Sequence, residues 1–220
     1  MSDSTEEPAD RGAPAEAESV AVASTPGRKR PKPGERRVQI LQTLARMLEQ
    51  PGAERITTAA LAARLEVSEA ALYRHFASKA QMFEGLIEFI ESSVFTLVNQ
   101  IAERDESGAL QAQRIAMMLL QFGEKNPGMT RVMVGDALVF EHERLITRMN
   151  QFFDRVESQL RSCLRPAAEA KGSATPTVDA NVMASAMTSL IVGRLQRYAR
   201  SGFRRLPTEA IEAPLQRLAS

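Results

Sequence analysis

Residues 57–79 gather side chains that can bind an anion or lie against the edges of stacked bases. Tyr73, His75 and Lys79 can donate hydrogen bonds to phosphate oxygens. Ala71 carries a methyl group that can pack on the methyl of thymine. Together these residue types predict binding to double-stranded DNA. The candidate DNA-binding residues are Arg36, Thr57, Thr58, Ser68, Glu69, Ala71, Tyr73, Arg74, His75 and Lys79.

Two short helices joined by a tight turn are expected to position these groups. Thr57 or Thr58 can cap the first helix, whose N-terminal N–H groups then form an anion site. Ser68 can cap the second helix, which we expect to run from Glu69 to His75, with residues 66 and 67 as the turn. In a helix-turn-helix the start of the second helix meets base edges and its flanks meet phosphate. A helical hairpin that binds no nucleic acid is the plainer alternative.

A third helix, from Glu35 to Gln50, is expected to brace this pair and to end at Pro51-Gly52. Its predicted core stripe consists of Val38, Leu41, Ala45 and Leu48. The residues predicted to pack the second helix of the pair on the first are Ala70, Leu72 and Phe76.

Charge separates the chain into three stretches. Residues 1–27 hold six acidic residues against one Arg, net −5, whereas residues 28–80 hold eleven Lys and Arg against five Glu, net +6. Residues 81–220 hold sixteen charges of each sign, so the overall charge of +1 conceals a basic module. Such a module suits a surface that must displace counterions from phosphate.

The run Tyr73-Arg74-His75-Phe76, followed by Lys79, resembles the end of the DNA-binding motif of TetR-type regulators. A wider resemblance, over roughly residues 35–220, is to the nucleoid occlusion factors of the TetR type. It is carried by ERRVQILQTLARMLE, RITTAALAARLEVSEAALYRHFASKAQMFEGLIEFIE, FGEKNPGMTRVM and the stretch from Phe140 to Arg165. The resemblance implies a homodimer that binds dispersed palindromic chromosomal sites. When bound to DNA, it engages the tubulin-like division protein FtsZ and blocks septum assembly over the nucleoid.

Three positions depart from the family pattern. Glu66 stands in the turn where many TetR-type proteins carry Gly, so we expect a slightly different turn. Leu97 and Gln121 stand where close relatives carry Arg and Gly, which changes the surface on which FtsZ would dock.

The fold class predicted is all-α and TetR-like, with an N-terminal three-helix helix-turn-helix domain and a C-terminal helical dimerisation bundle. Residues 1–34 are expected to be a disordered tail with a basic end, Arg28 to Lys32. The cluster Arg28 to Arg37 is either an arm that reaches DNA or a solvated linker. Residues 35–80 form the DNA-binding domain. Residues 81–220 form the domain for dimerisation and for a partner or ligand.

Within that C-terminal domain, apolar spacing predicts helices over 79–104, 108–125, 129–134, 140–164 and 178–200. The buried stripe of the first includes Leu97, and Pro166 is expected to end the fourth. The last two are the dimerisation candidates, although the same faces can be ordinary core of one chain. The candidate dimer residues are Val182, Met183, Ala186, Met187, Leu190 and Gly193.

Two binding functions compete for this domain. A typical TetR-type repressor holds a small effector whose entry separates the reading heads. An FtsZ-binding protein instead needs a surface trough with a basic rim, which we favour over an effector. The candidate partner-binding residues are Phe89, Met118, Phe122, Lys125 and Asn126.

Catalysis, cofactors and metals find no support in the residue pattern. His75 and His142 stand in unrelated segments, no Gly-rich phosphate loop or metal-spaced cluster occurs, and Cys163 is the sole cysteine. The sequence holds no apolar stretch long enough to span a bilayer, and we expect no signal sequence, since no basic-then-apolar run opens it. We expect a cytoplasmic, nucleoid-associated binding protein that is neither an enzyme nor a membrane protein.

Overall fold

The computed structural model describes residues 34–50, 55–104 and 106–219, and all regular elements in these ranges are helices. This confirms the predicted all-α class. The predicted tail with its basic end, and the predicted helix stop at Pro51-Gly52, lie outside the described residues. Among the helices described, none combines the length and apolar character that a membrane crossing requires.

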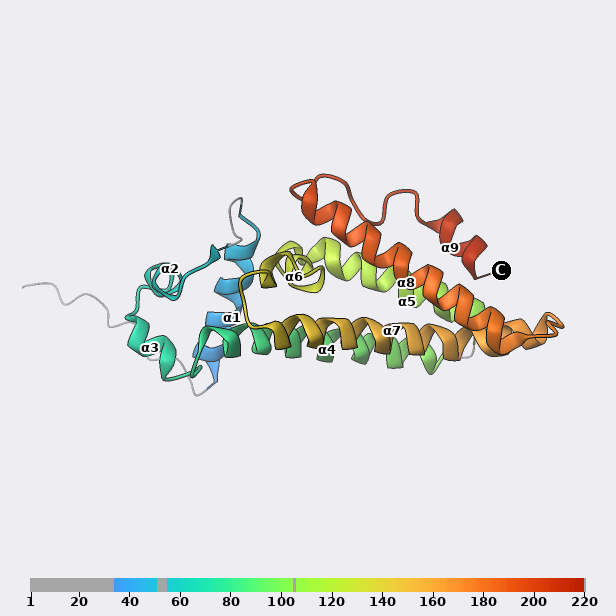
Figure 1. Ribbon diagram of the computed structural model, residues 1–220, viewed down its shortest axis with the longest axis horizontal. Helices are drawn as coiled ribbons and strands as arrows, with labels where there is room; N and C mark the ends of the chain where they lie inside the picture. The colour runs from blue at the N-terminus through green and yellow to red at the C-terminus, as the bar shows by residue number, and fades with distance from the viewer. Residues whose placement is uncertain (1–33, 51–54, 105, 220) are drawn as a thin grey trace, which may run out of the picture. The chain divides into compact units, whose positions relative to one another are not determined.

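Three helices form what we call the head: α1 (Glu35–Leu48), α2 (Thr58–Arg64) and α3 (Glu69–Tyr73). Contacts join α1 to α2 and α2 to α3, and the three lie together in Figure 1. The α2 helix begins where the Thr57 hydroxyl accepts the N–H of Ala60 at 3.1 Å, and α3 begins where Ser68 Oγ accepts the N–H of Ala71 at 3.3 Å. Both predicted caps are confirmed, and α3 ends two residues earlier than predicted.

The buried face of α1 includes Ile40, Leu44 and Leu48, which recur every four residues, and the predicted Ala45 is buried with them. The prediction that Val38 belongs to this face was wrong, since its side chain is 53% exposed. Val38 precedes Ile40 by two residues, or about 200° around the helix, so the two cannot face the same neighbour.

The same helical geometry corrects a prediction for α3, the second helix of the predicted pair. Leu72 and Phe76 are buried as predicted, but Ala70 is exposed because it lies two residues from Leu72.

The remaining helices form what we call the body. They are α4 (Lys79–Ala102), α5 (Gly108–Lys125), α6 (Pro127–Met133), the short 3₁₀ helix η2 (Asp136–Leu138), α7 (Glu143–Ala170), α8 (Pro176–Arg200) and α9 (Glu212–Leu218). In Figure 1, α4 and α7 lie lengthwise beside one another, α5 and α8 pack on them, and α9 lies against α8. The predicted bounds of α5 are confirmed at both ends.

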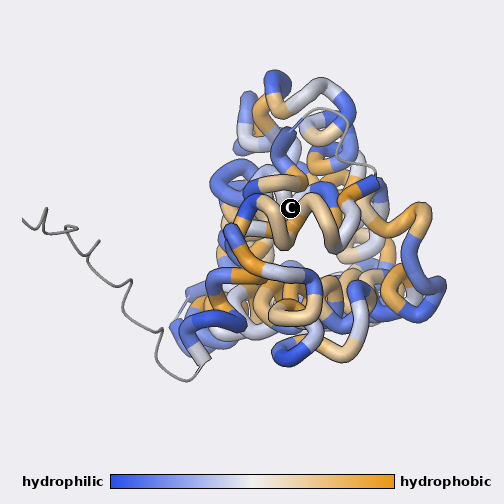
Figure 2. Tube along the Cα trace, turned by 90° about the vertical axis from the view of Figure 1, so that its left-hand side faces the viewer, coloured by the Kyte–Doolittle hydropathy of each residue, from blue (hydrophilic) through white to orange (hydrophobic). Residues whose placement is uncertain are grey.

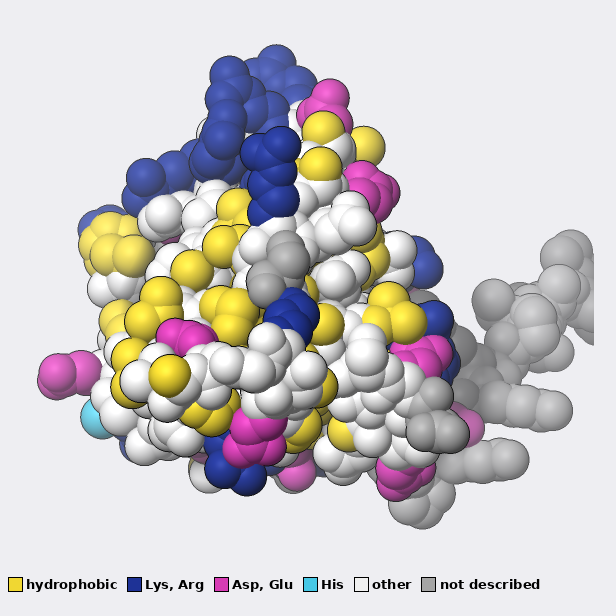
Figure 3. All heavy atoms as spheres, turned by 90° about the vertical axis from the view of Figure 1, so that its right-hand side faces the viewer, with side chains coloured by type: hydrophobic (Ala, Val, Ile, Leu, Met, Phe, Trp, Pro, Cys, Tyr) yellow, Lys and Arg dark blue, Asp and Glu magenta, His cyan; other side chains and the backbone are white. Residues whose placement is uncertain are grey.

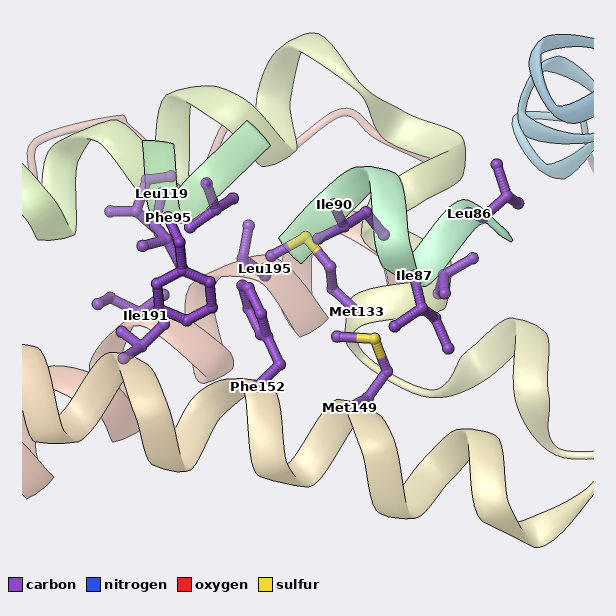
Figure 4. Close-up of a cluster of buried hydrophobic side chains, with 14 of the residues drawn as sticks. Leu86, Ile87, Ile90, Phe95, Leu119, Met133, Met149, Phe152, Ile191 and Leu195 are labelled. Carbon is purple, nitrogen blue, oxygen red and sulfur yellow. The ribbon is translucent and has the colours of Figure 1, made fainter. Parts of the chain in front are cut away.

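Aliphatic, Met and Phe side chains from several body helices meet in one core (Figure 4). Phe95 of α4, Leu119 of α5, Phe152 of α7 and Ile191 of α8 point toward one another, and Phe95 and Phe152 make an edge-to-face contact at 5.6 Å between ring centroids. Hydrophobic and hydrophilic segments alternate along the helices in Figure 2, as expected for amphipathic helices around such a core.

One helix runs further than its sequence predicts. The α7 helix was expected to end at Pro166, yet Pro166 lies inside it and the helix continues to Ala170. A proline within a helix removes one backbone hydrogen bond and costs roughly 3 kcal/mol. Leu164 and Ala168, on either side of Pro166, are buried, so packing of α7 outweighs the local cost.

The α4 helix leaves the head and enters the body. Ser78 caps it as predicted, its hydroxyl accepting the N–H of Gln81 at 3.2 Å. Its buried face includes Val94 and Val98, whereas Leu97 is more than one third exposed, against the prediction. The exposed Leu97 side chain lies next to α5, at a hollow described below.

Head and body also meet where α1 packs on α6. A Cβ atom added to Gly128 of α6 would lie 2.0 Å from the backbone oxygen of Ala45 in α1. The two backbones therefore approach as closely as a glycine allows, and this contact fixes α1 on the body.

Candidate functional site

The α3 helix and the residues that flank it turn a polar face outward. Ser68, Glu69, Arg74 and His75 are exposed, and Tyr73 is nearly half exposed, whereas Ala71 is half-buried. The two residues predicted to meet the groove therefore differ in exposure: Ser68 is exposed, whereas Ala71 is already partly covered by its own chain. Arg36 of α1, another candidate, is half-buried.

Three candidate residues are joined in one hydrogen-bond network across the hairpin. Thr58 Oγ1 donates to Glu69 Oε2 at 2.6 Å, and the Tyr73 hydroxyl lies 3.5 Å from the same Thr58 oxygen. The network links the first turn of α2 to both ends of α3. It orients Glu69 and Tyr73 before any ligand arrives, which lowers the entropy cost of binding.

Arg37 positions the C-terminal end of α3 and was missed from the sequence. Its Nη1 donates to the backbone oxygen of His75 at 2.7 Å, and its guanidinium lies 4.2 Å from the centroid of the Phe76 ring. A cation near the last carbonyls of a helix also opposes the negative end of its dipole. A contact across 38 residues leaves no mark in local spacing, so sequence reasoning had no signal for it.

The turn between α2 and α3 keeps a left-handed residue. Glu66 has φ +55°. The turn therefore keeps a positive φ although Glu stands in place of Gly, whereas we had expected a slightly different turn from this departure. The N–H of Val67 bonds to the carbonyl of Ala62 at 3.0 Å and closes the turn.

Lys79, the last candidate in the motif, forms an ion pair with Glu141, which lies in the loop before α7. Two further ion pairs join α4 to α7 itself. Arg144 of α7 bonds to Glu84 of α4 at 2.7 Å, and Arg148 bonds to Glu91 at 2.6 Å. Hydrogen bonding to Glu91 holds the pKa of Arg148 above its ordinary value.

The predicted partner-binding residues do not line one trough. Phe89 is 48% exposed on α4, Met118 and Phe122 are half-buried on α5, and Lys125 is exposed at the end of that helix. Asn126 caps the junction of α5 and α6, and its side chain donates to the carbonyl of Phe122 at 2.7 Å. Asn126 lines a separate hollow between α1 and α6.

Met118 instead lines a hollow between α4 and α5 of about 290 Å³, which we call the α4–α5 hollow. Leu97 and Gln121, the two departures noted in the sequence, lie in the same lining. Its full lining is Leu97, Gln100, Ile101, Arg104, Arg114, Met117, Met118 and Gln121. The lining of the hollow therefore combines apolar side chains with two arginines, of which Arg114 is paired with Glu106.

The candidate dimer residues lie on α8, and all but Met187 are at least partly exposed. Val182 is 64% exposed, and Met183, Ala186, Leu190 and Gly193 are half-buried. Met187 is fully buried in the core of its own chain, so its side chain is not available to a partner and it was wrongly included. The face of the body opposite the head carries scattered hydrophobic side chains, with Lys and Arg gathered toward one edge (Figure 3).

The two histidines and the cysteine have local surroundings of their own. His142 caps α7, its Nδ1 accepting the N–H of Arg144 at 3.3 Å, and His75 is exposed on the head. Burial raises the pKa of the Cys163 thiol, which keeps it protonated and unreactive. Within the residues that the structure describes, no three His, Cys, Asp or Glu residues are grouped to hold a metal ion.

Comparison with known proteins defines the class first. A model described as bacterial regulatory proteins of the tetR family matches residues 40–86, which contain α2 and α3. A TetR-like transcriptional regulator from Rhodococcus sp. RHA1 has a similar structure, with a TM-score of 0.66 and 19% identity, covering 83% of this chain and 93% of that one. The TetR family regulator PfmR from Thermus thermophilus gives a TM-score of 0.65 and 19% identity, over 82% and 94% of the two chains. The fold and the head are those of a TetR-type DNA-binding regulator.

A narrower assignment follows from sequence. A model described as a tetracyclin repressor-like C-terminal domain of the SlmA type matches residues 108–219. Nucleoid occlusion factor SlmA from Photobacterium profundum is 49% identical over 186 residues, which is 84% of this chain and 94% of the relative. SlmA from Vibrio cholerae is 50% identical over 79% of this chain and 88% of the relative. The chain belongs to the SlmA family of nucleoid occlusion factors.

Proposed function

We propose that the chain acts as a cytoplasmic, nucleoid-associated homodimer that binds palindromic chromosomal sites and, when bound, engages FtsZ to inhibit septum assembly. Membership of the SlmA family is the observation that carries this proposal. The proposed function is that of a binding protein, and it assigns no catalytic residue, metal or cofactor.

DNA binding is assigned to the outward face of α3 and the groups around it. Ser68 and Ala71 are at the start of the helix, where base edges are met, and Tyr73, Arg74 and His75 follow toward the phosphates. The N-terminus of α2, capped by Thr57, adds backbone N–H groups suited to an anion.

The DNA assignment is tested by mobility shift on sheared genomic DNA at low ionic strength, followed by titration of salt. Arg74→Ala should weaken binding and reduce the slope of log affinity against log salt by about 0.9, as for one lost phosphate contact. Arg200→Ala, which removes an equally exposed arginine from α8, is the control and should leave the slope unchanged. Failure of the unaltered protein to retard any fragment would refute DNA binding.

The FtsZ assignment favours the side of the body where α4 and α5 meet. The α4–α5 hollow combines apolar side chains with Arg104, whose charge suits a peptide that carries acids and apolar residues. Phe89 and Lys125 extend the same pair of helices with one exposed aromatic and one exposed cation.

Cosedimentation with FtsZ polymers, with and without a bound DNA duplex, tests this assignment. Binding should be stronger when DNA is present. Lys125→Glu and Arg104→Glu, made separately, should each weaken FtsZ binding without changing DNA affinity, and the larger loss identifies the part of the surface that carries the contact. No binding to FtsZ in either condition would contradict the proposal.

The effector-released repressor remains the alternative that this experiment separates. It predicts that a metabolite releases the DNA and raises the melting temperature, with no response to FtsZ. Leu119, Phe152 and Leu195 are fully buried and lie between the helices of the body (Figure 4).

A further inference from the structure

The ion pair between Lys79 and Glu141 joins a candidate phosphate contact of the DNA-binding motif to a loop of the body. Lys79 is the first residue of α4, and its side chain is 29% exposed. Glu141 precedes α7, and its side chain is only 9% exposed. The Glu141 side chain is thus nearly covered, whereas the Lys79 side chain is partly open to solvent.

The neighbouring loop residue holds a second cation of the head. The Arg55 guanidinium, just before α2, lies 4.5 Å from the centroid of the Phe140 ring. Phe140 is itself 58% exposed. Two consecutive loop residues therefore contact two cations, one at each end of the hairpin formed by α2 and α3.

The polarity of this pair differs from that of its neighbours. In the pairs Glu84–Arg144 and Glu91–Arg148, α4 supplies the acid and α7 supplies the cation. At Lys79 and Glu141 the signs are exchanged, and this is the pair nearest the head. Because the other two pairs hold α7 on α4, the pair at Glu141 can break without detaching the helix.

A carboxylate in contact with an ammonium group cancels most of the charge that a phosphate would otherwise meet. We propose that Glu141 sets the DNA affinity of the protein by competing with phosphate for Lys79, and that DNA binding transfers Lys79 from Glu141 to the backbone of the duplex. This inference rests on the proposed function, since it requires Lys79 to meet phosphate. It identifies a residue of the body that regulates the head.

Glu141→Gln isolates the charge of this residue. The amide oxygen of Gln still accepts a hydrogen bond from Lys79, so the position of the ammonium group is kept while its competitor is removed. Glu143→Gln is the matched control, because Glu143 is exposed in the first turn of α7 and the change in net charge is the same. Comparison with Glu143→Gln therefore removes any effect of overall charge on DNA affinity.

The measurement is fluorescence anisotropy on a duplex of random sequence, about 30 base pairs long, over a range of NaCl concentrations, since phosphate contacts need no particular sequence. Glu141→Gln should bind roughly three- to tenfold more tightly than Glu143→Gln at low salt, with the same slope of log affinity against log salt, because Lys79 meets phosphate in both complexes. An affinity equal to that of Glu143→Gln would overturn the inference.

Lys79→Gln completes the cycle, alone and together with Glu141→Gln. The double variant places two amides where the ion pair stood, so no buried carboxylate is left without a partner. Glu141→Gln should have no effect when Lys79 is absent, and an undiminished effect would show that the charge acts elsewhere. If the unaltered protein binds no duplex at low salt, the proposed function and this inference both fail. If Lys79→Gln weakens binding but Glu141→Gln does not strengthen it, the inference alone fails.

Discussion

At Glu66 the backbone adopts a conformation that costs a non-glycine residue roughly 1–2 kcal/mol. The turn between α2 and α3 needs this positive φ, because it brings the chain back so that Ser68 can cap the reading helix. The cost is borne at a position next to the DNA-binding face. Local strain of this kind persists because the packing of Leu61 and Leu72 on either side fixes the turn.

Glu66→Gly should therefore stabilise the protein by about 1 kcal/mol, which corresponds to a rise of roughly 2–4 °C in melting temperature for a chain of this size. Glu66→Ala is the control, since it removes the carboxylate and keeps the strain. The difference between the two variants, measured by thermal unfolding followed by circular dichroism, isolates the backbone contribution. If Gly and Ala give the same melting temperature, the strain is not a cost of the native turn.

Residues whose partners are close in sequence could be predicted, and residues whose partners are distant could not. Thr57, Ser68 and Ser78 each cap a helix through a contact three residues away, which propensity and spacing reveal. Arg37 and Lys79 meet partners 38 and 62 residues along the chain. Such contacts depend on how helices pack, which a single sequence does not specify.

At the scale of elements, the bounds of α5 were predicted correctly, and local groups define both of its ends in the structure. Ser107 caps it at one end, and Asn126-Pro127 stops it at the other. The signal at Pro166 conflicted with packing, and packing prevailed in α7. The face of each helix followed from its period, with errors at Val38, Ala70 and Leu97, whose side chains are exposed.

The contact between α6 and α1 is the element-scale feature that a single methyl group should disrupt. Gly128→Ala would place its Cβ 2.0 Å from the Ala45 carbonyl oxygen, and backbone cannot move aside as a flexible side chain can. We expect a loss of about 2 kcal/mol or more in stability, with a fall of roughly 4–8 °C in melting temperature. DNA affinity should fall as well, because α1 joins the rest of the head to the body.

Pro127→Ala tests whether the effect belongs to the close approach. Pro127 is the half-buried first residue of the same helix, and its replacement should cost less than about 1 kcal/mol. Equal losses at both positions would mean that α6 is sensitive to any change and that the contact with Ala45 is not special.

At the scale of the whole molecule, one protomer offers a short reading surface. The α3 helix has five residues. The groove contacts that we propose for it come from Ser68 and the first turn. Two such helices, about 34 to 36 Å apart, are required to read half-sites one duplex turn apart. The dimer thus supplies both the affinity and the spacing that one head lacks, and the surface that joins two protomers becomes part of DNA recognition.

The outward stripe of α8 is the surface we assign to this role. Leu190→Glu combined with Ala186→Glu should place charges in an apolar contact and yield protomers of 24.2 kDa in light scattering, where the unaltered protein gives twice that mass. DNA affinity should fall with dimerisation, because a monomer engages one half-site. Asn181→Glu, exposed about 100° around the helix from Val182, adds charge away from the stripe and should leave the dimer intact. A double variant that remains dimeric would move the interface off this face of α8, since two buried carboxylates cannot be accommodated there without partners.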